Sequence, residues 1–258
     1  KTPMMEAFLR ACENLTGCFN RNLSWEEKGR TYQLAAEKLA LPIKRVPGLA
    51  LPDGSHLWNG QPLPLHLFDF VVHSWHHRHR KEALIFYFPK LENEEEAAYL
   101  RELIEQTEAA IFARDPSCPP GNTRILVVFE NPRAIFRIRE MAAALGPHFL
   151  GGSLGWHDFL ASTARMFRKD PRYRIPVKAD PDIVIKRIKA SHQILVRELT
   201  PLGAMKIGGM YGVLFEEGNP DSYLLSMIGY IRDVITQLKR GLDGFWVAHP
   251  DFVRIGIA

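Results

Sequence analysis

The sequence is poor in the features that mark secreted or membrane-spanning proteins. It holds only three cysteines among 258 residues, an odd number without CxxC spacing, which argues against a disulfide framework and favours reduced thiols in a cytoplasmic compartment. No apolar run is long enough to cross a membrane, and the first residues do not resemble a signal peptide. Internal repeats and low-complexity tracts are also missing. We therefore expect a globular, cytoplasmic protein without a membrane partner.

An excess of one charge is lacking too. The chain has 33 basic and 29 acidic residues, a formal net charge of +4, which suits an anionic small molecule as well as nucleic acid. Because the basic residues are not interleaved with aromatic ones along a strand or stripe, we expect no nucleic-acid partner. With 46% hydrophobic and 24% charged residues, the composition is that of an ordinary folded protein, and the length fits one α/β barrel or two smaller domains.

Apolar runs alternate with amphipathic stretches along most of the chain. Residues 1–38 are expected to be a largely helical segment, a remnant of a preceding part of a barrel. Beyond it, strands are predicted within 39–48, 83–90, 125–129, 148–153, 204–210 and 243–250. Helices are predicted within 65–82, 92–113, 133–145, 180–199 and 221–240. This alternation is typical of parallel βα units, so residues 39–258 are predicted to form a (β/α)8 barrel of the TIM type, incomplete at its N-terminal end.

A carboxylate closes the most apolar of these strands. Ile125 to Phe129 is typical of a strand buried on both faces, and Glu130 follows it directly. Pro132 then suits the first turn of a helix, where its missing N–H is not needed. Glu130 is therefore predicted at the carboxyl end of a strand, where α/β folds place their chemistry. A capping or salt-bridged Glu130 is the simpler alternative.

Asp158 follows the next predicted strand, 28 residues after Glu130. Neighbouring parallel strands lie about 4.8 Å apart, so both carboxylates could reach one cation, and Mg²⁺ commonly takes one or two protein carboxylates. Arg45, at the end of an earlier strand, could bind a substrate carboxylate through its two-pronged guanidinium. Ordinary surface salt bridges remain the alternative for all three residues.

Four segments resemble parts of malate synthases, and the similarity extends from about Tyr32 to the end of the chain. They are LFDF (67–70), FYFPKLE (86–92), IGGM (207–210) and DGFWVAHPDFV (243–253), the last being similar to that family's D-G-T-W-V-A-H-P-x-L-V segment. The family's magnesium ligands, a Glu closing a strand and the Asp of a G-R-W-D-Y motif, match Glu130 and Asp158 in type and spacing. Its glyoxylate-binding Arg-x-x-Gly-x-x-Leu segment matches Arg45 to Leu51.

The resemblance implies a Mg²⁺-dependent Claisen condensation of acetyl-CoA with glyoxylate to malate and CoA, the malate synthase reaction of the glyoxylate cycle. It implies Mg²⁺ on Glu130 and Asp158, and a catalytic, substrate-binding Arg45. Further substrate-binding residues would be Gly155, Trp156, His157 and Asp158. The acyl-CoA would contact Gly208, Gly209, Met210, Trp246, His249 and Pro250.

Two departures from the family pattern bear on specificity. The G-R-W-D-Y motif is Gly155-Trp156-His157-Asp158-Phe159 here, and the R-P-R-G-W-H-L motif keeps its first Arg but not its second Arg or its Trp-His pair. Two alternatives stay open: a related lyase or synthase with another acyl-CoA or 2-oxoacid, and a non-catalytic malate synthase-like binding domain. The family's first barrel strand and its helical C-terminal domain, which carries an Asp base, would lie outside Lys1 to Ala258. These residues alone are therefore expected to be inactive in condensation.

The segment HSWHHRHRKE contains His73, His76, His77 and His79. The i, i+3 spacing of His73 and His76 allows a zinc hypothesis. A basic, exposed helix is the preferred interpretation, because zinc sites usually combine ligands from separate elements. A packing role for one of these histidines is a further alternative. Cys118, in DPSCPPGN, is expected to be a loop thiol without a basic neighbour arranged to activate it.

Overall fold

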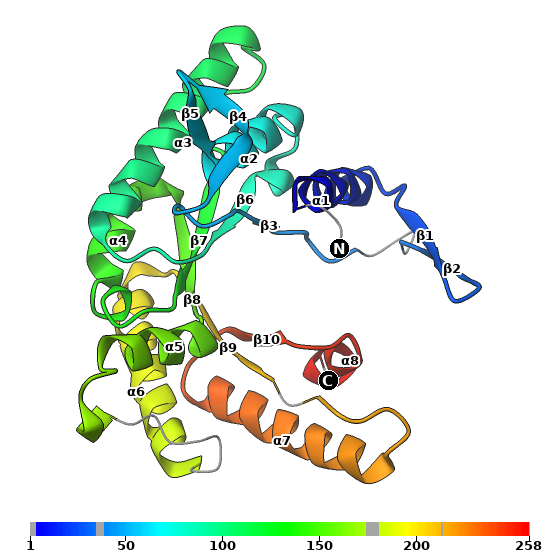
Figure 1. Cartoon of the computed structure of the whole chain (residues 1–258), viewed down its shortest axis with the longest axis vertical. Helices are drawn as coiled ribbons and strands as arrows, with labels where there is room; N and C mark the ends of the chain where they lie inside the picture. The colour runs from blue at the N-terminus through cyan, green and yellow to red at the C-terminus, as the bar shows by residue number, and fades with distance from the viewer. Residues whose placement is uncertain (1–3, 35–38, 174–180, 213, 258) are drawn as a thin grey trace. The chain divides into compact units, whose positions relative to one another are not determined.

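The structure is a computed structural model of the chain that describes residues 4–34, 39–173, 181–212 and 214–257 (Figure 1). Its contacts form two compact units, which are described one at a time. Unit 1 is Lys1–Phe88 with Glu102–Arg124, and unit 2 is Pro89–Arg101 with Ile125–Ala258. No helix among the described residues is both long and apolar enough to cross a membrane. The predicted domain boundary after residue 38 remains a prediction, since residues 35–38 lie outside the described part.

Unit 2 contains four strands that pair in parallel and in chain order. They are β7 (Arg124–Phe129), β8 (Phe149–Leu154), β9 (Met205–Tyr211) and β10 (Gly244–Val247). Each of the four was predicted from its apolar run. Since parallel neighbours run in one direction, their carboxyl ends meet at one edge, which is where functional side chains of such sheets gather.

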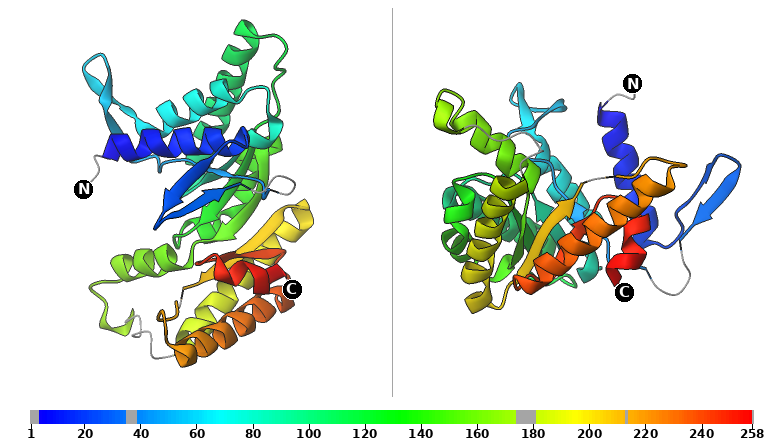
Figure 2. Two further views of the ribbon diagram at one scale, coloured as in Figure 1. Left: turned by 90° about the vertical axis from the view of Figure 1, so that its right-hand side faces the viewer. Right: turned by 90° about the horizontal axis from the view of Figure 1, so that it is seen from below.

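Helices follow these strands, and those near 92–113, 133–145, 180–199 and 221–240 were predicted from the sequence, whereas the helix after the last strand was not. They are α4 (Ile138–Leu145), α5 (Trp156–Met166), α6 (Pro181–Leu199), α7 (Pro220–Lys239) and α8 (Asp251–Ile257), and α3 (Glu94–Arg114) runs from unit 2 into unit 1. Helix α6 packs against β8 and β9, and α7 against β9 and β10 (Figure 2). Short 3₁₀ turns lie at Lys81–Leu84, Ala134–Phe136, Gly146–His148, Pro171–Tyr173 and Thr200–Leu202.

The core of unit 2 has two parts. Strand β7 is buried from Ile125 to Phe129, which agrees with its uninterrupted apolar sequence. A second cluster joins α7 to α8, where the rings of Tyr230 and Phe252 stack with centroids 4.7 Å apart and Met227 lies beside them. Burial of two large aromatic rings anchors the short helix α8 at the end of β10.

Unit 1 contains the other two predicted strands. β3 (Lys44–Arg45) pairs in parallel with β6 (Ile85–Phe88), so that Arg45 lies opposite Tyr87. Helix α1 (Met4–Phe19) precedes them, and an antiparallel hairpin of β4 (Pro52–Trp58) and β5 (Gln61–Pro64) leads into α2 (Leu65–His76). The hairpin turns at Asn59-Gly60, where both residues have positive φ, as a two-residue turn of this kind requires.

The prediction that residues 1–38 are largely helical is wrong for part of this segment. Helix α1 ends at Phe19, and β1 (Ser24–Glu27) and β2 (Arg30–Gln33) form an antiparallel hairpin. The turn residues Lys28 and Gly29 both have positive φ, and the rings of Trp25 and Tyr32 stack across the strands at 5.2 Å. Cross-strand aromatic pairing and a turn-forming glycine therefore override helix propensity here. Residues 1–3 and 35–38 of the segment lie outside the described residues.

The prediction of an exposed basic helix at 73–79 is wrong for two of its histidines. His73 and His77 are buried, and His73 Nε2 lies 2.9 Å from the carbonyl oxygen of Ala83. The ring of His77 lies 5.1 Å from that of Phe19 on α1. Burial lowers the pKa of His73 to about 4, so this imidazole is neutral at physiological pH and acts as a packing residue.

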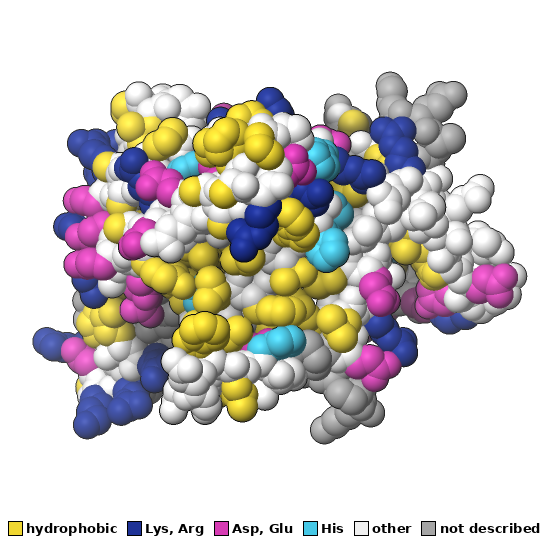
Figure 3. Space-filling view, turned by 90° about the horizontal axis from the view of Figure 1, so that it is seen from above, with side chains coloured by type: hydrophobic (Ala, Val, Ile, Leu, Met, Phe, Trp, Pro, Cys, Tyr) yellow, Lys and Arg dark blue, Asp and Glu magenta, His cyan; other side chains and the backbone are white. Residues whose placement is uncertain are grey.

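Apolar side chains are prominent on the face shown in Figure 3, with basic and acidic side chains scattered among them. In unit 1, Leu57 and Trp58 at the β4–β5 hairpin are 61% and 70% exposed. A groove of about 480 Å³ lies between α2 and α3, lined by Leu67, Val71, Trp75, Leu103, Gln106, Thr107, Ala110, Ile111 and Arg114. This groove is mainly apolar, in contrast to the polar hollow of unit 2 described below.

Candidate functional site

Glu130 lies at the carboxyl end of β7, as the sequence predicted. The register pairs Phe129 with Leu154, and the N–H of Gly155 donates to the carbonyl of Phe129 at 3.0 Å, so the ends of β7 and β8 are adjacent. Glu130 is only 4% exposed, and its Oε1 accepts a hydrogen bond of 2.7 Å from the N–H of Lys90. Glu130 thus accepts a backbone N–H and lies 3.8 Å from the Lys90 ammonium, contacts that the simpler interpretation of a capping or salt-bridged Glu130 also predicts.

Asp158 lies in the first turn of α5, and Lys90 connects it to Glu130. The Lys90 Nζ is 2.8 Å from Asp158 Oδ2 and 3.8 Å from Glu130 Oε1. The structure thus brings the two predicted metal ligands together around one ammonium group. Lys90 was not among the residues predicted from the sequence. Its position directly after the strand-ending Pro89, which matches the position of Glu130 after β7, could have indicated it.

The electrostatics of this cluster favour an additional positive charge. Burial, and next the neighbouring Asp158 carboxylate, raise the pKa of Glu130 to about 7, whereas the ammonium of Lys90 acts in the opposite direction. One ammonium therefore does not compensate two carboxylates, of which one is buried. The donor set of two carboxylates at adjacent strand ends fits Mg²⁺, a hard cation that prefers oxygen ligands and keeps several waters.

This raised pKa predicts an unusual pH dependence of stability. The pKa of Glu130 in the folded protein, about 7, lies above its ordinary value of 4.5, so the folded state retains a proton that the unfolded chain releases. Without metal, the free energy of unfolding is therefore expected to decrease as pH rises from about 4.5 to about 7. Urea titrations across this range test it, with Glu130→Gln as control. The same slope in the control variant would assign the pH dependence to another group.

The residues between Gly155 and Asp158 differ in what they contact. Gly155 packs directly on Glu130, because a Cβ at this position would lie 2.5 Å from Glu130 Cβ. Trp156 is half-buried and faces Gly209 on β9, whereas His157 is exposed and faces Gly212. Gly155 is thus a spacer for the carboxylate, and the substrate-binding roles predicted for these residues remain predictions.

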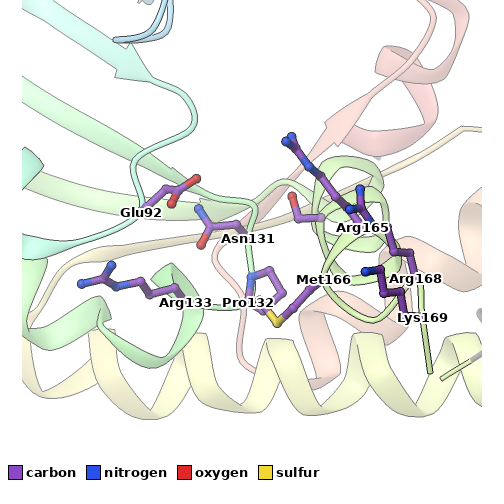
Figure 4. A pocket seen from close by; sticks show the side chains of 9 residues that line it. Glu92, Asn131, Pro132, Arg133, Arg165, Met166, Arg168 and Lys169 are labelled. Carbon is purple, nitrogen blue, oxygen red and sulfur yellow. The ribbon is translucent and has the colours of Figure 1, made fainter. Parts of the chain in front are cut away.

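A hollow of about 740 Å³ lies next to this cluster in unit 2 (Figure 4). The hydroxyl of Ser162, one of its lining residues, donates to the carbonyl of Glu130 at 3.4 Å. The other lining residues are Glu92, Asn131, Pro132, Arg133, Arg165, Met166, Arg168 and Lys169. Asn131 holds the turn after β7, since its amide donates to Leu91 and accepts from Ala134. Four cationic side chains against one carboxylate make the hollow suited to an anionic group.

The residues predicted to bind acyl-CoA lie at the ends of β9 and β10. Met210 pairs with Trp246 in the register, Met210 is 38% exposed, and Trp246 is half-buried. Gly208 is a packing glycine, because a Cβ there would lie 1.6 Å from Gln237 Oε1. The Gly209 carbonyl accepts a hydrogen bond of 3.2 Å from the amide of that same Gln237.

His249 and Pro250 precede the last helix. The ring Nδ1 of His249 accepts from the N–H of Asp251 at 3.3 Å, which caps the start of α8. The ring is also 5.5 Å from that of Phe215. His249 therefore has a structural contact of its own, and the acyl-CoA contacts predicted for it and for Pro250 stay predictions.

Arg45 is exposed at the end of β3 in unit 1. Its guanidinium carbon lies 6.0 Å from the centre of the Tyr87 ring, the residue opposite it in the strand pair. The preceding Lys44 points into the core instead, where its Nζ forms a 2.7 Å ion pair with Asp69. Alternation along the strand thus directs Arg45 to solvent, where a ligand could reach it.

The chain is similar to known proteins along most of its length. Residues 41–258 match the family model described as malate synthase, TIM barrel domain. Malate synthase A of Escherichia coli (strain K12) is 27% identical over 254 residues, and the malate synthase of Streptomyces clavuligerus is 29% identical over 255 residues. Each alignment covers 95% of this chain but only 46% of the relative, so the chain spans about half the length of these relatives.

The fold is similar to solved malate synthases. A lead(II) complex of the Haloferax volcanii malate synthase aligns with a TM-score of 0.51 and 14% identity, covering 73% of this chain and 47% of that one. Its pyruvate and acetyl-CoA ternary complex aligns with the same TM-score of 0.51. With the six parallel strands, these comparisons confirm the predicted (β/α)8 barrel fold class.

Proposed function

The chain belongs to the malate synthase family, and from this premise we propose that it serves the Mg²⁺-dependent condensation of acetyl-CoA with glyoxylate to malate and CoA. The observation that carries the proposal is the pair of carboxylates Glu130 and Asp158 at adjacent strand ends, with the Lys90 ammonium 2.8 Å from one and 3.8 Å from the other. Glu130 and Asp158 would hold Mg²⁺, which when bound supplies a Lewis acid for the oxygen atoms of glyoxylate.

The remaining roles fall to side chains and backbone groups of the chain. The N–H groups at the start of α5 would hold the glyoxylate carboxylate, because a helix N-terminus favours anions. Arg45 would bind the oxoacid and stabilise negative charge that grows on its oxygen. The basic hollow beside the cluster supplies positive charge for an anionic substrate. Three free cysteines fit a reducing compartment, and we propose the cytoplasm.

Calorimetric titration with Mg²⁺ and then with glyoxylate tests the proposal at the level of binding. We expect one Mg²⁺ per chain and glyoxylate binding that depends on it. A chain that binds neither would contradict the proposal, whereas glyoxylate binding that is independent of Mg²⁺ would remove the role given to Glu130 and Asp158.

A second candidate is a related synthase for another 2-oxoacid or acyl-CoA. It is favoured by the replacement of the family's motif Arg, since the chain has Trp156 and His157 before Asp158, and His157 is exposed. Calorimetric titration of the Mg²⁺-loaded chain with several 2-oxoacids and acyl-CoA thioesters separates the two candidates without requiring turnover. Tightest binding of glyoxylate and acetyl-CoA supports the first candidate, and tightest binding of another pair supports the second.

Arg45→Lys is expected to weaken glyoxylate binding by about 10-fold or more while leaving Mg²⁺ affinity within about 2-fold. A guanidinium presents two parallel donors to a planar carboxylate, and an ammonium offers only a point charge. Arg30→Lys, on the exposed strand β2, is the matched control. Equal losses for both ligands in the Arg45 variant would instead indicate a structural role.

A further inference from the structure

Three side chains of unit 1 with different metal-binding chemistry lie together, although His79 is far along the chain from Asp115 and Cys118. His79 is in the turn after α2, Asp115 directly follows α3, and Cys118 is in the loop that leads to β7. His79 Nδ1 is 3.3 Å from Cys118 Sγ, and His79 Nε2 is 3.2 Å from Asp115 Oδ2. One donor atom from each residue fits within 4.8 Å of the others. The sequence-based expectation that Cys118 lacks a basic neighbour is therefore wrong.

The loop that carries Cys118 is held in place at both ends. Asp115 Oδ1 accepts hydrogen bonds from the N–H and the hydroxyl of Ser117, and the N–H of Cys118 donates to the Asp115 carbonyl at 3.0 Å. At the far end the Glu108 carboxylate accepts from the N–H of Gly121 at 2.6 Å and of Thr123 at 2.9 Å. Because the loop is already ordered, binding a ligand here would cost little conformational entropy.

We propose that His79, Asp115 and Cys118 form a binding site for Zn²⁺ or a similar borderline-soft divalent ion. Thiolate, imidazole and carboxylate are together the ligands of zinc, whereas Mg²⁺ avoids sulfur. Only one nitrogen of the His79 ring can bind the ion, and with one donor atom from each residue the three atoms lie within 4.8 Å of one another. Ligand atoms of a tetrahedral zinc lie roughly 3.3–3.8 Å apart, so the three side chains must move slightly closer together around the ion. Cys118 is 8% exposed and the His79 side chain 56% exposed, which leaves one side open for the ion and a bound water.

The charges around the cluster are compatible with a divalent ion. Thiolate and carboxylate together neutralise Zn²⁺. Asp115 accepts hydrogen bonds from Ser117 and Arg78, which hold its carboxylate in place. Arg78 donates its Nε to Asp115 at 2.8 Å and stacks on the Trp75 ring at 4.1 Å, so it is fixed in place and orients the carboxylate from outside. Its charge reduces the affinity of the site without blocking the thiol or the imidazole.

The site is tested on the full chain by competition for Zn²⁺ with a chromophoric chelator. We expect one Zn²⁺ per chain, unaffected by excess Mg²⁺ and by Glu130→Gln, which separates it from the carboxylate pair of unit 2. Cys118→Ser and His79→Gln are expected to weaken Zn²⁺ binding by about 100-fold or more, and Asp115→Asn by at least about 10-fold. Replacing Zn²⁺ by Co²⁺ should give a thiolate-to-metal charge-transfer band in the near ultraviolet that Cys118→Ser abolishes.

Two matched variants control for unspecific binding by histidine and thiol. His76→Gln removes an exposed histidine at the end of α2, just before the turn that carries His79. Cys18→Ser removes a half-buried thiol on α1. Both variants should bind Zn²⁺ with an affinity within about 2-fold of that of the unmodified chain. An unchanged thermal unfolding midpoint shows that each variant is still folded. Absence of stoichiometric Zn²⁺ binding, or binding that survives Cys118→Ser with the fold intact, would overturn the proposal. In that case the three side chains would form a hydrogen-bonded network and would not be a metal site.

Discussion

Glu130→Gln and Asp158→Asn are each expected to lower the affinity for Mg²⁺ by more than about 100-fold while leaving the fold intact. Loss of groups that merely orient a metal ligand costs about 10- to 100-fold, so loss of a ligand charge should cost more. The Gln at 130 retains an oxygen that can accept the 2.7 Å hydrogen bond from the N–H of Lys90. Asp158 has a side chain 50% exposed, so Asn there disturbs little packing.

Calorimetry with Mg²⁺ measures this effect, and two further variants sharpen it. Asp170→Asn makes the same chemical change at an aspartate that pairs with Arg172 elsewhere in unit 2, and it should leave Mg²⁺ binding unchanged. Lys90→Gln should have the opposite effect and increase the affinity for Mg²⁺, because the ammonium of Lys90 competes with the ion for both carboxylates. Full Mg²⁺ affinity in both carboxylate variants would remove the metal assignment.

The sequence located this cluster because strand ends are readable from apolar runs. Ile125 to Phe129 is long and bounded, so the position of Glu130 followed from the period of the strand and from the turn at Asn131-Pro132. Asp158 followed in the same way from the end of β8. Lys90 was missed because a lysine after a strand is usually solvated, and only the three-dimensional contacts show that it lies between the two acids.

Other features depend on contacts that local patterns do not encode. The hairpin at 24–33 has no Asn-Gly or Asp-Gly turn, so its Lys28-Gly29 turn was not recognised. His73 contacts the carbonyl of Ala83 and His77 packs on the ring of Phe19, and neither partner lies on α2. Cys118 and His79 are 39 residues apart and meet only because α2 and α3 pack in one unit. Hydrophobic periodicity therefore predicts strands and helices, but it does not predict which polar residues, distant in sequence, contact one another.

Gly155→Ala is expected to destabilise the fold and to impair Mg²⁺ binding together. An added Cβ would lie 2.5 Å from Glu130 Cβ, 2.7 Å from its Oε2 and 2.8 Å from Val128 Cγ1. The first of these atoms is next to the backbone and cannot rotate away, so β7 or Glu130 itself must shift. Overpacking of this kind costs about 1–3 kcal/mol. The φ of Gly155 is −85°, which alanine adopts without strain, so the expected loss is steric and has no backbone component.

Gly209→Ala provides the matched comparison on the neighbouring strand β9. A Cβ there would meet Trp156 Cβ at 3.5 Å and the Leu154 carbonyl at 3.7 Å, which is ordinary contact, so this variant should lose less than about 1 kcal/mol and bind Mg²⁺ normally. Urea unfolding and Mg²⁺ titration are to be measured on both variants, since moving a ligand carboxylate by even a fraction of an ångström weakens a rigid octahedral site. If Gly155→Ala is as stable as Gly209→Ala and binds Mg²⁺ equally well, Gly155 does not position Glu130, and its predicted contact with substrate becomes the better explanation for a glycine between β8 and α5.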